Sequence, residues 1–528
     1  MYLLIALSAI IVPFFLLVLL RMSAAKGMTI SAVIVILLAI TVWGMEGIII
    51  SSSILQGIHK ALTILWILFG ALLLLNTLQR TGAVVRINQG FRSISEDMRV
   101  QAIIVAFLFG ALIEGAAGFG APAMVTGPLL FALGFSPLVA ATLALIADST
   151  SVAFGAVGTP LTVGLSNSPE AGQSFFHEVA VAITSMDLMA GTFIPFMVVA
   201  VLTTFFGKGF KESLPMLPWT LFIGITYTVS AFIYAYLFGH EFVSILASLT
   251  GLIIATWTAK KGWLMPKDTW KEALREDFET QPNEKSMSIL SAWAPYVAVV
   301  ILLLLTRTVG WLENFTQSFI DLTWTDILGV AEIDSDWELL YSPGTILAIA
   351  ALVAVLVQRK SFANVTKATT ESLTSMKMTA IALISTLIMV QVFVNSGMNL
   401  NDLTSMPNYI AQAMASSMGP IWIFVAPFLG ELGSFISGSA TVSTLTFSPI
   451  QIDVANSTGY PVNTVLAAQL IGAGAGNMFC VHNVVAASGA VGLSGKEGDI
   501  IRKTLLPAII YGLLIGIAGF IVLFFLVS

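Results

Sequence analysis

Three carboxyl groups and one imidazole lie within long apolar stretches of this chain. They belong to Glu114, Asp148, Glu431 and His482. Ionisable groups cost free energy to bury at membrane depth, and they usually mark function there. A carboxyl group in a low-dielectric setting can hold a proton at neutral pH. We therefore expect Glu114, Asp148 and Glu431 to couple protons, with pairing to a backbone N–H or a neighbouring helix as the alternative role for Glu431.

Small polar residues and glycines surround these groups in two regions of the chain. Hydroxyl and amide groups can bind a hydroxyl or carboxylate, glycine lets a backbone approach closely, and backbone N–H groups at helix starts favour anions. No lysine or arginine lies convincingly inside an apolar stretch, so we expect backbone groups to supply most of the positive potential. The predicted substrate-binding residues are Gly120, Ser149, Thr150, Ser151, Ser437, Gly438, Ser439, Thr441, Asn477, His482 and Asn483. A packing role for His482 stays open.

The chain lacks the side-chain sets of metalloenzymes and nucleotide-dependent enzymes. Cys480 is the single cysteine, which excludes an intramolecular disulfide and a cysteine-based zinc site. The 4 histidines are widely spaced, and neither a metalloprotease helix motif nor a phosphate-binding glycine loop is present. We expect no catalytic residues, no metal and no cofactor, and we predict that the protein is not an enzyme.

Composition places these residues in a membrane. Hydrophobic residues make up 57% of the 528 residues and charged residues 10%, whereas soluble proteins carry about 25% charged residues. The apolar stretches are long and continuous, which excludes the alternating pattern of a membrane β-barrel and predicts helices. The net charge of −6 and the absence of a basic cluster argue against nucleic acid. Lipid is the expected solvent.

The predicted class is an all-α polytopic membrane protein with roughly 12–14 spans of about 20 residues. Clear candidates are 2–20, 30–50, 60–79, 100–114, 186–206, 217–238, 241–258, 288–308, 343–357, 379–395, 419–430 and 505–527. Two further regions, 111–165 and 430–490, are apolar but crowded with glycine, serine, threonine, alanine and proline. We expect broken or re-entrant helices in both.

These two regions resemble each other. Pro122 lies eight residues after Glu114, and Ser439 lies eight residues after Glu431. Matching regions that enter the membrane from opposite sides are typical of inverted-repeat transporters, although small residues also serve simply to pack membrane helices. The predicted organisation is an N-terminal repeat over 1–258 with the re-entrant region 111–165, a cytoplasmic loop over 259–287, and a C-terminal repeat over 288–528. The C-terminal repeat contains an extracellular insert over 310–342 and the re-entrant region 430–490.

The distribution of lysine and arginine predicts the orientation. The basic loops can all be cytoplasmic at once if both termini lie outside. The segment from Gly310 to Tyr341 is then external, and it is acidic and nearly free of lysine and arginine.

Several motifs resemble the lactate permease family over nearly the whole chain. The first half carries Glu114-Gly-Ala-Ala-Gly-Phe-Gly-Ala-Pro-Ala123, Leu133-Gly-Phe-Ser-Pro137 and Ala153-Phe-Gly-Ala-Val-Gly-Thr-Pro160. The second half carries Gly472-Ala-Gly-Ala-Gly476, Ala486-Ala-Ser-Gly-Ala-Val-Gly-Leu493 and Gly495-Lys-Glu-Gly-Asp-Ile500. Many members of that family differ from this chain at Ala440, Asn477 and His482.

The resemblance implies a permease of the bacterial or archaeal cytoplasmic (inner) membrane that takes up lactate or glycolate by proton symport. Sodium coupling stays open, because Asp148, Ser149 and Thr150 also offer the oxygen ligands that hard cations prefer. Another small organic anion as substrate, a homodimeric assembly and an anion channel stay open too. Two matching regions inside one chain argue against a channel, whose selectivity filter is usually repeated around an axis.

Overall fold

The computed structural model describes residues 2–20, 22–118, 120–165, 168, 170–275, 278, 287–418 and 421–527. Helices joined by loops make up this part of the chain, and its extended pairing is limited to isolated bridges. The predicted all-α class is confirmed.

Long apolar helices dominate the structure. The described ranges contain nine helices long and apolar enough to cross a membrane, or ten if the pair Gln173–Asp187 and Gly191–Phe206, bent by 47°, counts as one span. Five shorter apolar helices are Ser8–Leu17, Pro122–Ala132, Pro137–Ala147, Pro343–Val357 and Trp422–Ser437. The expected spans 2–20, 343–357 and 419–430 overlap three of these shorter helices.

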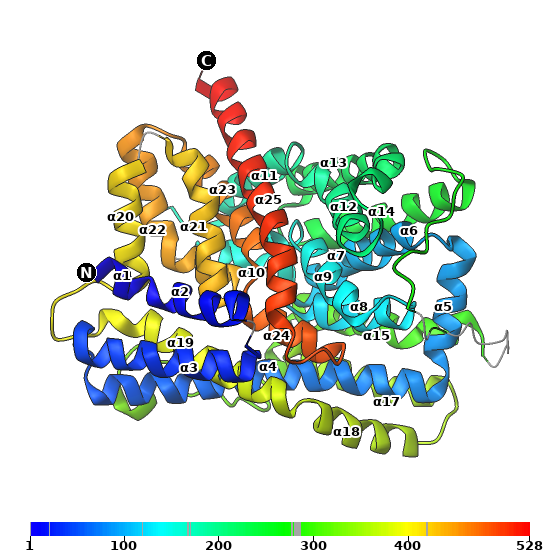
Figure 1. Cartoon of the computed structure of the whole chain (residues 1–528), viewed down its shortest axis with the longest axis horizontal. Helices are drawn as coiled ribbons and strands as arrows, with labels where there is room; N and C mark the ends of the chain where they lie inside the picture. Colours follow the sequence, from blue (N-terminus) through cyan, green and yellow to red (C-terminus); the bar gives the residue numbers. More distant parts are fainter. Residues whose placement is uncertain are drawn as a thin grey trace.

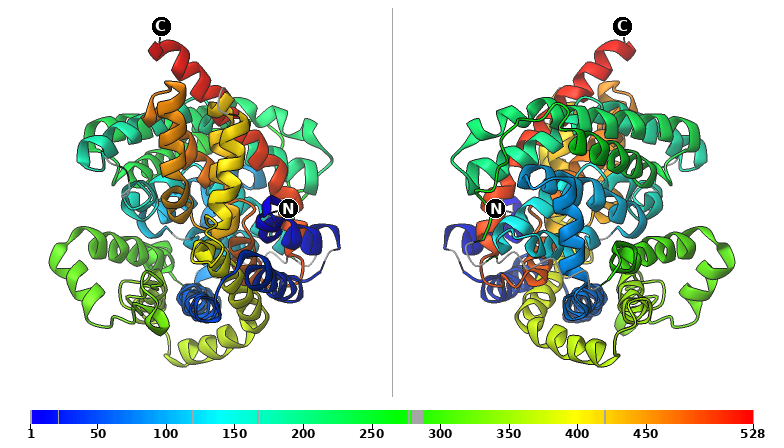
Figure 2. Two further views of the ribbon diagram at one scale, coloured as in Figure 1. Left: turned by 90° about the vertical axis from the view of Figure 1, so that its left-hand side faces the viewer. Right: turned by 90° about the vertical axis from the view of Figure 1, so that its right-hand side faces the viewer.

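Helix α4 (Gly47–Thr81) is the longest element, and it packs along α17 (Pro343–Val357) and α19 (Lys377–Val394). A Cβ on Gly57 would lie 2.6 Å from the Cα of Ile388, and a Cβ on Gly70 would collide with the carbonyl oxygen of Gly344. Small residues allow such close approach between membrane helices. In Figures 1 and 2, α4 runs along the long axis, whereas α21 (Trp422–Ser437), α22 (Ala440–Thr458) and α25 (Glu497–Val527) run across it.

The helices of both glycine-rich regions are broken, as expected. In the first region, α7 (Gly110–Ala117) is followed by α8 (Ala121–Ala132), and α9 (Pro137–Ala147) by α10 (Gly155–Thr162). In the second, α21 is followed by α22, and α23 (Val462–Gly476) by α24 (Val481–Ala490). The backbone turns at Gly118, Gly120 and Gly438, whose φ angles are +62°, +75° and +66°. An inverted relation between the two regions stays a prediction.

The acidic segment 310–342 folds against the first half of α4. It contains α16 (Gly310–Ser318) and two isolated bridges, Asp321 to Glu338 and Trp324 to Ser335. Ser52 Oγ donates to the Ile327 carbonyl at 2.9 Å, and Gln56 Nε2 donates to the Asp334 carbonyl at 2.7 Å. His59 Nδ1 and Ser335 Oγ are 2.8 Å apart. The insert therefore lies fixed on one end of α4.

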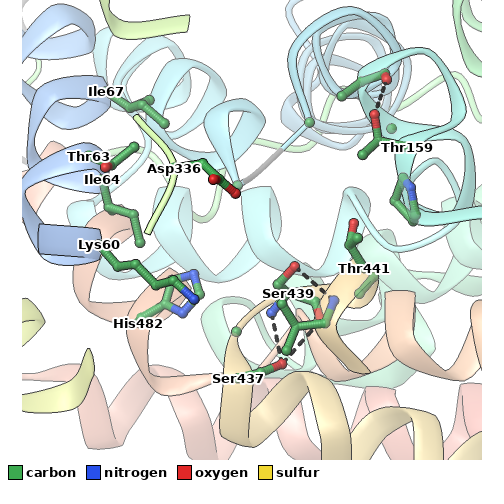
Figure 3. A pocket seen from close by; sticks show the side chains of 18 of the residues that line it. Lys60, Thr63, Ile64, Ile67, Thr159, Asp336, Ser437, Ser439, Thr441 and His482 are labelled. Carbon is green, nitrogen blue, oxygen red and sulfur yellow. Dashed lines mark hydrogen bonds between the residues drawn. The ribbon is translucent and has the colours of Figure 1, made fainter. Parts of the chain in front are cut away.

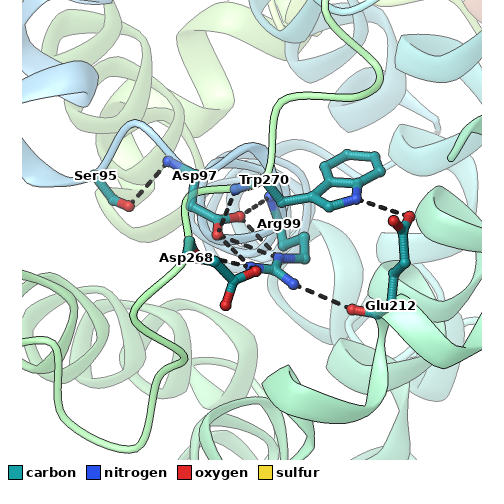
Figure 4. Close-up of polar contacts among 6 residues, drawn as sticks. All are labelled: Ser95, Asp97, Arg99, Glu212, Asp268 and Trp270. Atoms are coloured by element: carbon teal, nitrogen blue, oxygen red, sulfur yellow. Dashed lines mark hydrogen bonds and ion pairs between the residues drawn. The ribbon is translucent and has the colours of Figure 1, made fainter. Parts of the chain in front are cut away.

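The mid-chain loop is held by a buried arginine at the start of α6 (Met98–Ala102) (Figure 4). Arg99 Nη2 lies 2.6 Å from Asp97 Oδ2, and the guanidinium also donates to the Asp268 carbonyl at 3.3 Å. Trp270 donates its backbone N–H to Asp97 Oδ2 at 3.1 Å and its indole N–H to Glu212 Oε2 at 2.9 Å. Residues 276–277 and 279–286 of the predicted 259–287 loop are outside the described residues.

Candidate functional site

A cavity of about 560 Å³ lies where the two glycine-rich regions meet α4, α19 and the insert (Figure 3). Eight predicted site residues line it: Glu114, Gly120, Ser437, Gly438, Ser439, Thr441, Asn477 and His482. Residues from the two predicted re-entrant regions thus come together at one place, although more than 300 positions separate them in the sequence.

Four helices begin at the wall of this cavity. They contribute Gly120 before α8, Gly155 and Ala156 of α10, Ser439 to Val442 at the start of α22, and His482 of α24. The first N–H groups of a helix have no intrahelical partner, and they carry a partial positive charge. An anion in the cavity would therefore face several such helix starts.

Two serine hydroxyls stabilise the break between α21 and α22. Ser437 Oγ donates to the Gly433 carbonyl at 2.7 Å, and Ser439 Oγ accepts from the Val442 N–H at 3.3 Å, as an N-cap residue does. Thr441 follows in the first turn of α22 and lines the cavity (Figure 3). The serines shape this wall of the cavity, and Thr441 adds a hydroxyl group to it.

Lys60 places a positively charged side chain at the cavity, which the sequence analysis did not predict. It lies in the interior of α4, lines the cavity, and donates from Nζ to Gln391 Oε1 at 3.3 Å. The expectation that no lysine lies inside a span was wrong, because the predicted span 60–79 began at this residue whereas the helix begins thirteen residues earlier, at Gly47. A continuous reading of the apolar positions from 47 to 81 would have placed Lys60 inside the span.

His482 and Asn483 pack against two glycine turns. A Cβ on Gly438 would coincide with the imidazole of His482, and a Cβ on Gly120 would lie 2.7 Å from Asn483 Oδ1. Only glycine fits at either position, since both backbones also have a positive φ. The start of α24 is thereby held between the breaks of the two glycine-rich regions.

Glu114 lies near the C-terminal end of α7, and it is the carboxyl group of the first region that reaches the cavity. Its side chain is 2% exposed, and its Oε2 has no hydrogen-bond partner. A buried carboxyl group without a cation is less costly to bury in its protonated form than as a carboxylate. Glu114 thus places a buried carboxyl oxygen without a hydrogen-bond partner at the wall of the cavity.

The polar turn after α9 does not line the cavity. Ser149 Oγ donates to the Ile146 carbonyl at 3.0 Å, and Ser151 Oγ donates to the Asp148 carbonyl at 2.7 Å and to its Oδ1 at 3.3 Å. Thr150 is buried, and its Oγ1 has no partner. Glu114 and Val152 line the cavity, whereas Asp148 and these three hydroxyl residues do not.

Glu431 also lies away from the cavity. It faces α25, where a Cβ on Gly512 would collide with Glu431 Oε1, and that oxygen has no hydrogen-bond partner. Glu431 thus packs closely against a neighbouring helix, and its role stays a prediction.

Residues of the insert and of α19 complete the cavity. Asp336, Trp337, Glu338 and Tyr341 line it from the insert, and Gln391 lines it from α19. Their positions depend on contacts between segments that are distant in the sequence. No local sequence pattern therefore predicts that they line the cavity. Over the described residues, no group of three or more His, Cys, Asp or Glu side chains is arranged to hold a metal ion.

Comparisons with known proteins agree over the whole length of the chain. The family model described as L-lactate permease matches residues 2–526. A protein of Haemophilus influenzae is 31% identical over 488 residues, which cover 88% of this chain and 88% of that protein. L-lactate permease of Bacillus subtilis is 28% identical over 561 residues, covering 98% and 95% of the two chains. Glycolate permease GlcA of Escherichia coli is 28% identical over 549 residues, covering 97% and 94%.

Proposed function

The chain belongs to the L-lactate permease family, and on that premise we propose that it takes up lactate, or a related 2-hydroxy monocarboxylate such as glycolate, by proton symport. Membership of a permease family makes it a multi-pass membrane transporter and not an enzyme. We further propose that it lies in the bacterial or archaeal cytoplasmic membrane with both termini outside.

The substrate's carboxylate would bind between Lys60 and the starts of α22 and α24. A charge-assisted hydrogen bond from an ammonium group is stronger than a neutral one, and the helix starts add partial positive charge. Thr441 and Asn477 offer partners for the 2-hydroxyl group. Ile64, Ile67 and Val442 offer an apolar wall for a small alkyl group.

One observation carries the proposed proton coupling. The same cavity that offers Lys60 and several helix starts to an anion also contains Glu114, whose Oε2 is buried without a partner. Two negative charges in one low-dielectric cavity repel each other strongly. A carboxylate substrate is therefore favoured when Glu114 is protonated, which ties anion uptake to proton uptake. With one proton per anion, no net charge crosses the membrane.

Sodium coupling is the second candidate. The buried Thr150 Oγ1, which has no partner, lies two residues from the Asp148 carboxyl group. Hydroxyl, carboxylate and carbonyl oxygens are the ligands that a sodium ion would require, as other hard cations do.

Uptake of labelled L-lactate into proteoliposomes distinguishes proton coupling from sodium coupling. A pH gradient and a sodium gradient are imposed separately, with empty liposomes as the control. Accumulation on the pH gradient alone is the expected result. Accumulation that requires sodium would refute proton coupling, and transport of dicarboxylates without lactate or glycolate would refute the proposed substrate class.

A further inference from the structure

The insert places two acidic side chains at the binding cavity, to which the proposed function assigns no role. Asp336 and Glu338 line the cavity together with Lys60, and Figure 3 shows Asp336 and Lys60. Asp336 is exposed and Glu338 is partly buried, whereas the Glu114 side chain at the same cavity is 2% exposed. The cavity therefore has a buried end at Glu114 and a solvent-facing end at Asp336 and Glu338, which we call its mouth.

Contacts between the insert and α4 fix the position of Asp336. His59 Nδ1 lies 2.8 Å from Ser335 Oγ, and the rings of His59 and Trp337 meet edge to face with their centroids 5.6 Å apart. Asp336 lies between these two insert residues in the chain, and Lys60 directly follows His59 on α4. The contacts that hold the insert on α4 thus also hold Asp336 at the cavity.

Glu338 is fixed at the start of α17. Its backbone forms an isolated bridge with Asp321, and its carbonyl accepts from the Ser342 N–H at 3.0 Å. Ser342 is also the N-cap residue of α17, since its Oγ accepts from the Gly344 N–H at 3.3 Å. Both acids of the mouth are therefore positioned by the packing of the insert and not by a free loop.

The volume of the cavity does not by itself select the smallest substrates. A cavity of about 560 Å³ lies within the range of about 300–1,000 Å³ that is typical of sites for drug-sized ligands. Malate, a 2-hydroxy dicarboxylate, is only one carboxyl group larger than lactate, so it also fits. Selection between these two anions would therefore depend on charge.

The charges at the cavity treat the two anions differently. Lys60 is the single lysine or arginine among the lining residues that the structure describes, so one ammonium group and the helix starts compensate for one carboxylate. A sphere of the cavity's volume is roughly 10 Å across, which does not exceed the Debye length of about 10 Å at 0.1 M salt. A second carboxylate is therefore repelled by Asp336 and Glu338 wherever it lies in the cavity.

We propose that Asp336, together with Glu338, is a specificity-determining residue that excludes dicarboxylates from the cavity and admits monocarboxylates. This inference rests on the proposed uptake of a 2-hydroxy monocarboxylate. The single charge of lactate is balanced by Lys60 and the helix starts, whereas a dicarboxylate leaves its second charge unbalanced near the acids of the mouth. Like charges brought together disfavour the wrong partner, which is how a binding site gains specificity by repulsion.

Inhibition of labelled L-lactate uptake by L-malate in proteoliposomes tests the proposal. At neutral pH both carboxyl groups of malate are ionised, because ordinary carboxyl pKa values lie well below it. The measured quantity is the ratio of the inhibition constant of malate to the KM for lactate. We expect Asp336→Asn to lower this ratio at least about tenfold, and Asp336→Glu, which keeps the charge, to stay within about twofold of wild type.

Glu332→Gln is the matched control, because Glu332 is an exposed acid of the same insert that does not line the cavity. Its ratio is expected to equal that of wild type. An unchanged ratio in Asp336→Asn, or an equal fall in Glu332→Gln, overturns the proposal. Inhibition of the wild-type protein by malate as strongly as by unlabelled lactate overturns it as well, because there is then no exclusion.

The wild-type protein provides a measurement that does not depend on the folding of a variant. The Debye length falls from about 30 Å at 0.01 M salt to about 8 Å at 0.15 M, so salt weakens the repulsion and the wild-type ratio should fall over this range. A ratio that is constant or rises with salt overturns the proposal. If Asp336→Asn loses lactate uptake, this salt dependence decides. A wild-type protein that takes up no lactate refutes the proposed function itself.

Discussion

The imidazole ring of His482 occupies the space into which a side chain on Gly438 would project. This contact joins the start of α24 to the break between α21 and α22, and both residues line the cavity. The shape of the cavity wall therefore depends on position 438 being glycine, which has no side chain.

Gly438→Ala is expected to abolish transport. The added Cβ would displace His482, and the positive φ of +66° adds a strain of roughly 1–2 kcal/mol for a residue with a side chain. Gly459→Ala is the control, because Gly459 has a φ of +74° with nothing within 4 Å of its Cβ position. Lactate uptake and the melting temperature are measured for both. Equal uptake by the two variants would show that the contact with His482 is unimportant.

Lys60→Met is expected to raise the KM for lactate about tenfold to a hundredfold, because a hydrogen bond to a charged group contributes roughly 1.5–3 kcal/mol. Lys60→Arg keeps the charge and should recover part of the affinity. Lys367→Met, on α18 (Ala363–Ser375) and outside the cavity, is the control. The measurement is the initial rate of uptake against lactate concentration. An unchanged KM in Lys60→Met would exclude the lysine from anion binding.

Glu114→Gln is expected to eliminate accumulation on a pH gradient and to leave exchange of lactate less affected. The amide resembles the protonated acid in shape but cannot release a proton. Glu431→Gln serves as the comparison, since Glu431 is equally buried and does not line the cavity. Transport is assayed both as accumulation and as counterflow. Full accumulation by Glu114→Gln would remove this residue from the coupling mechanism.

Arg99→Met is expected to destabilise the protein by about 3–5 kcal/mol, because it leaves the buried Asp97 carboxylate without its cation. Arg99 and Asp97 are 1% and 4% exposed. Lys271→Met breaks an exposed pair with Glu96 nearby and should change stability little. Thermal unfolding in detergent gives the comparison. Similar melting temperatures for the two variants would contradict a structural role for the buried pair.

The pair between Arg80 and Glu371 predicts a pH dependence. The Arg80 guanidinium, by hydrogen bonding to Glu371, holds the pKa of that carboxyl group below its ordinary value. A lowered pKa in the folded state stabilises the protein above the unfolded pKa, and this contribution is lost as pH falls through the folded value. Glu371→Gln should therefore melt slightly below wild type at about pH 7, and the difference in melting temperature should shrink as the pH falls below the ordinary carboxyl range. A difference in melting temperature that persists at the lower pH would show that the ion pair with Arg80 is not its cause.

The sequence predicted the fold class and eight of the residues that line the cavity. Ser437, Gly438, Ser439 and His482 lie in segments whose small residues interrupt an apolar run, which is a local pattern. Asp336 is different, because it reaches the cavity through contacts that the insert makes with Gln56 and His59 of α4. Contacts between segments so distant in the chain leave no periodic pattern in the sequence from which they could be predicted.

Hydroxyl groups were harder to assign than helix breaks. Ser149, Thr150 and Ser151 were predicted to bind substrate because they follow a carboxyl group in an apolar setting. Ser149 and Ser151 instead donate to carbonyl groups of their own turn. Serine and threonine often form such local bonds, and the sequence does not show which hydroxyl groups are consumed in this way.

Helix α4 has 35 residues, which at about 1.5 Å per residue is roughly 52 Å, whereas the hydrocarbon core of a bilayer is about 30 Å thick. Such an excess is accommodated by tilting, by projection into water or by thickening of the surrounding lipid. Lys60 and the attachment points of the insert are on this one helix. Any tilt of α4 would therefore move Lys60 and the insert together, because both are attached to the same helix.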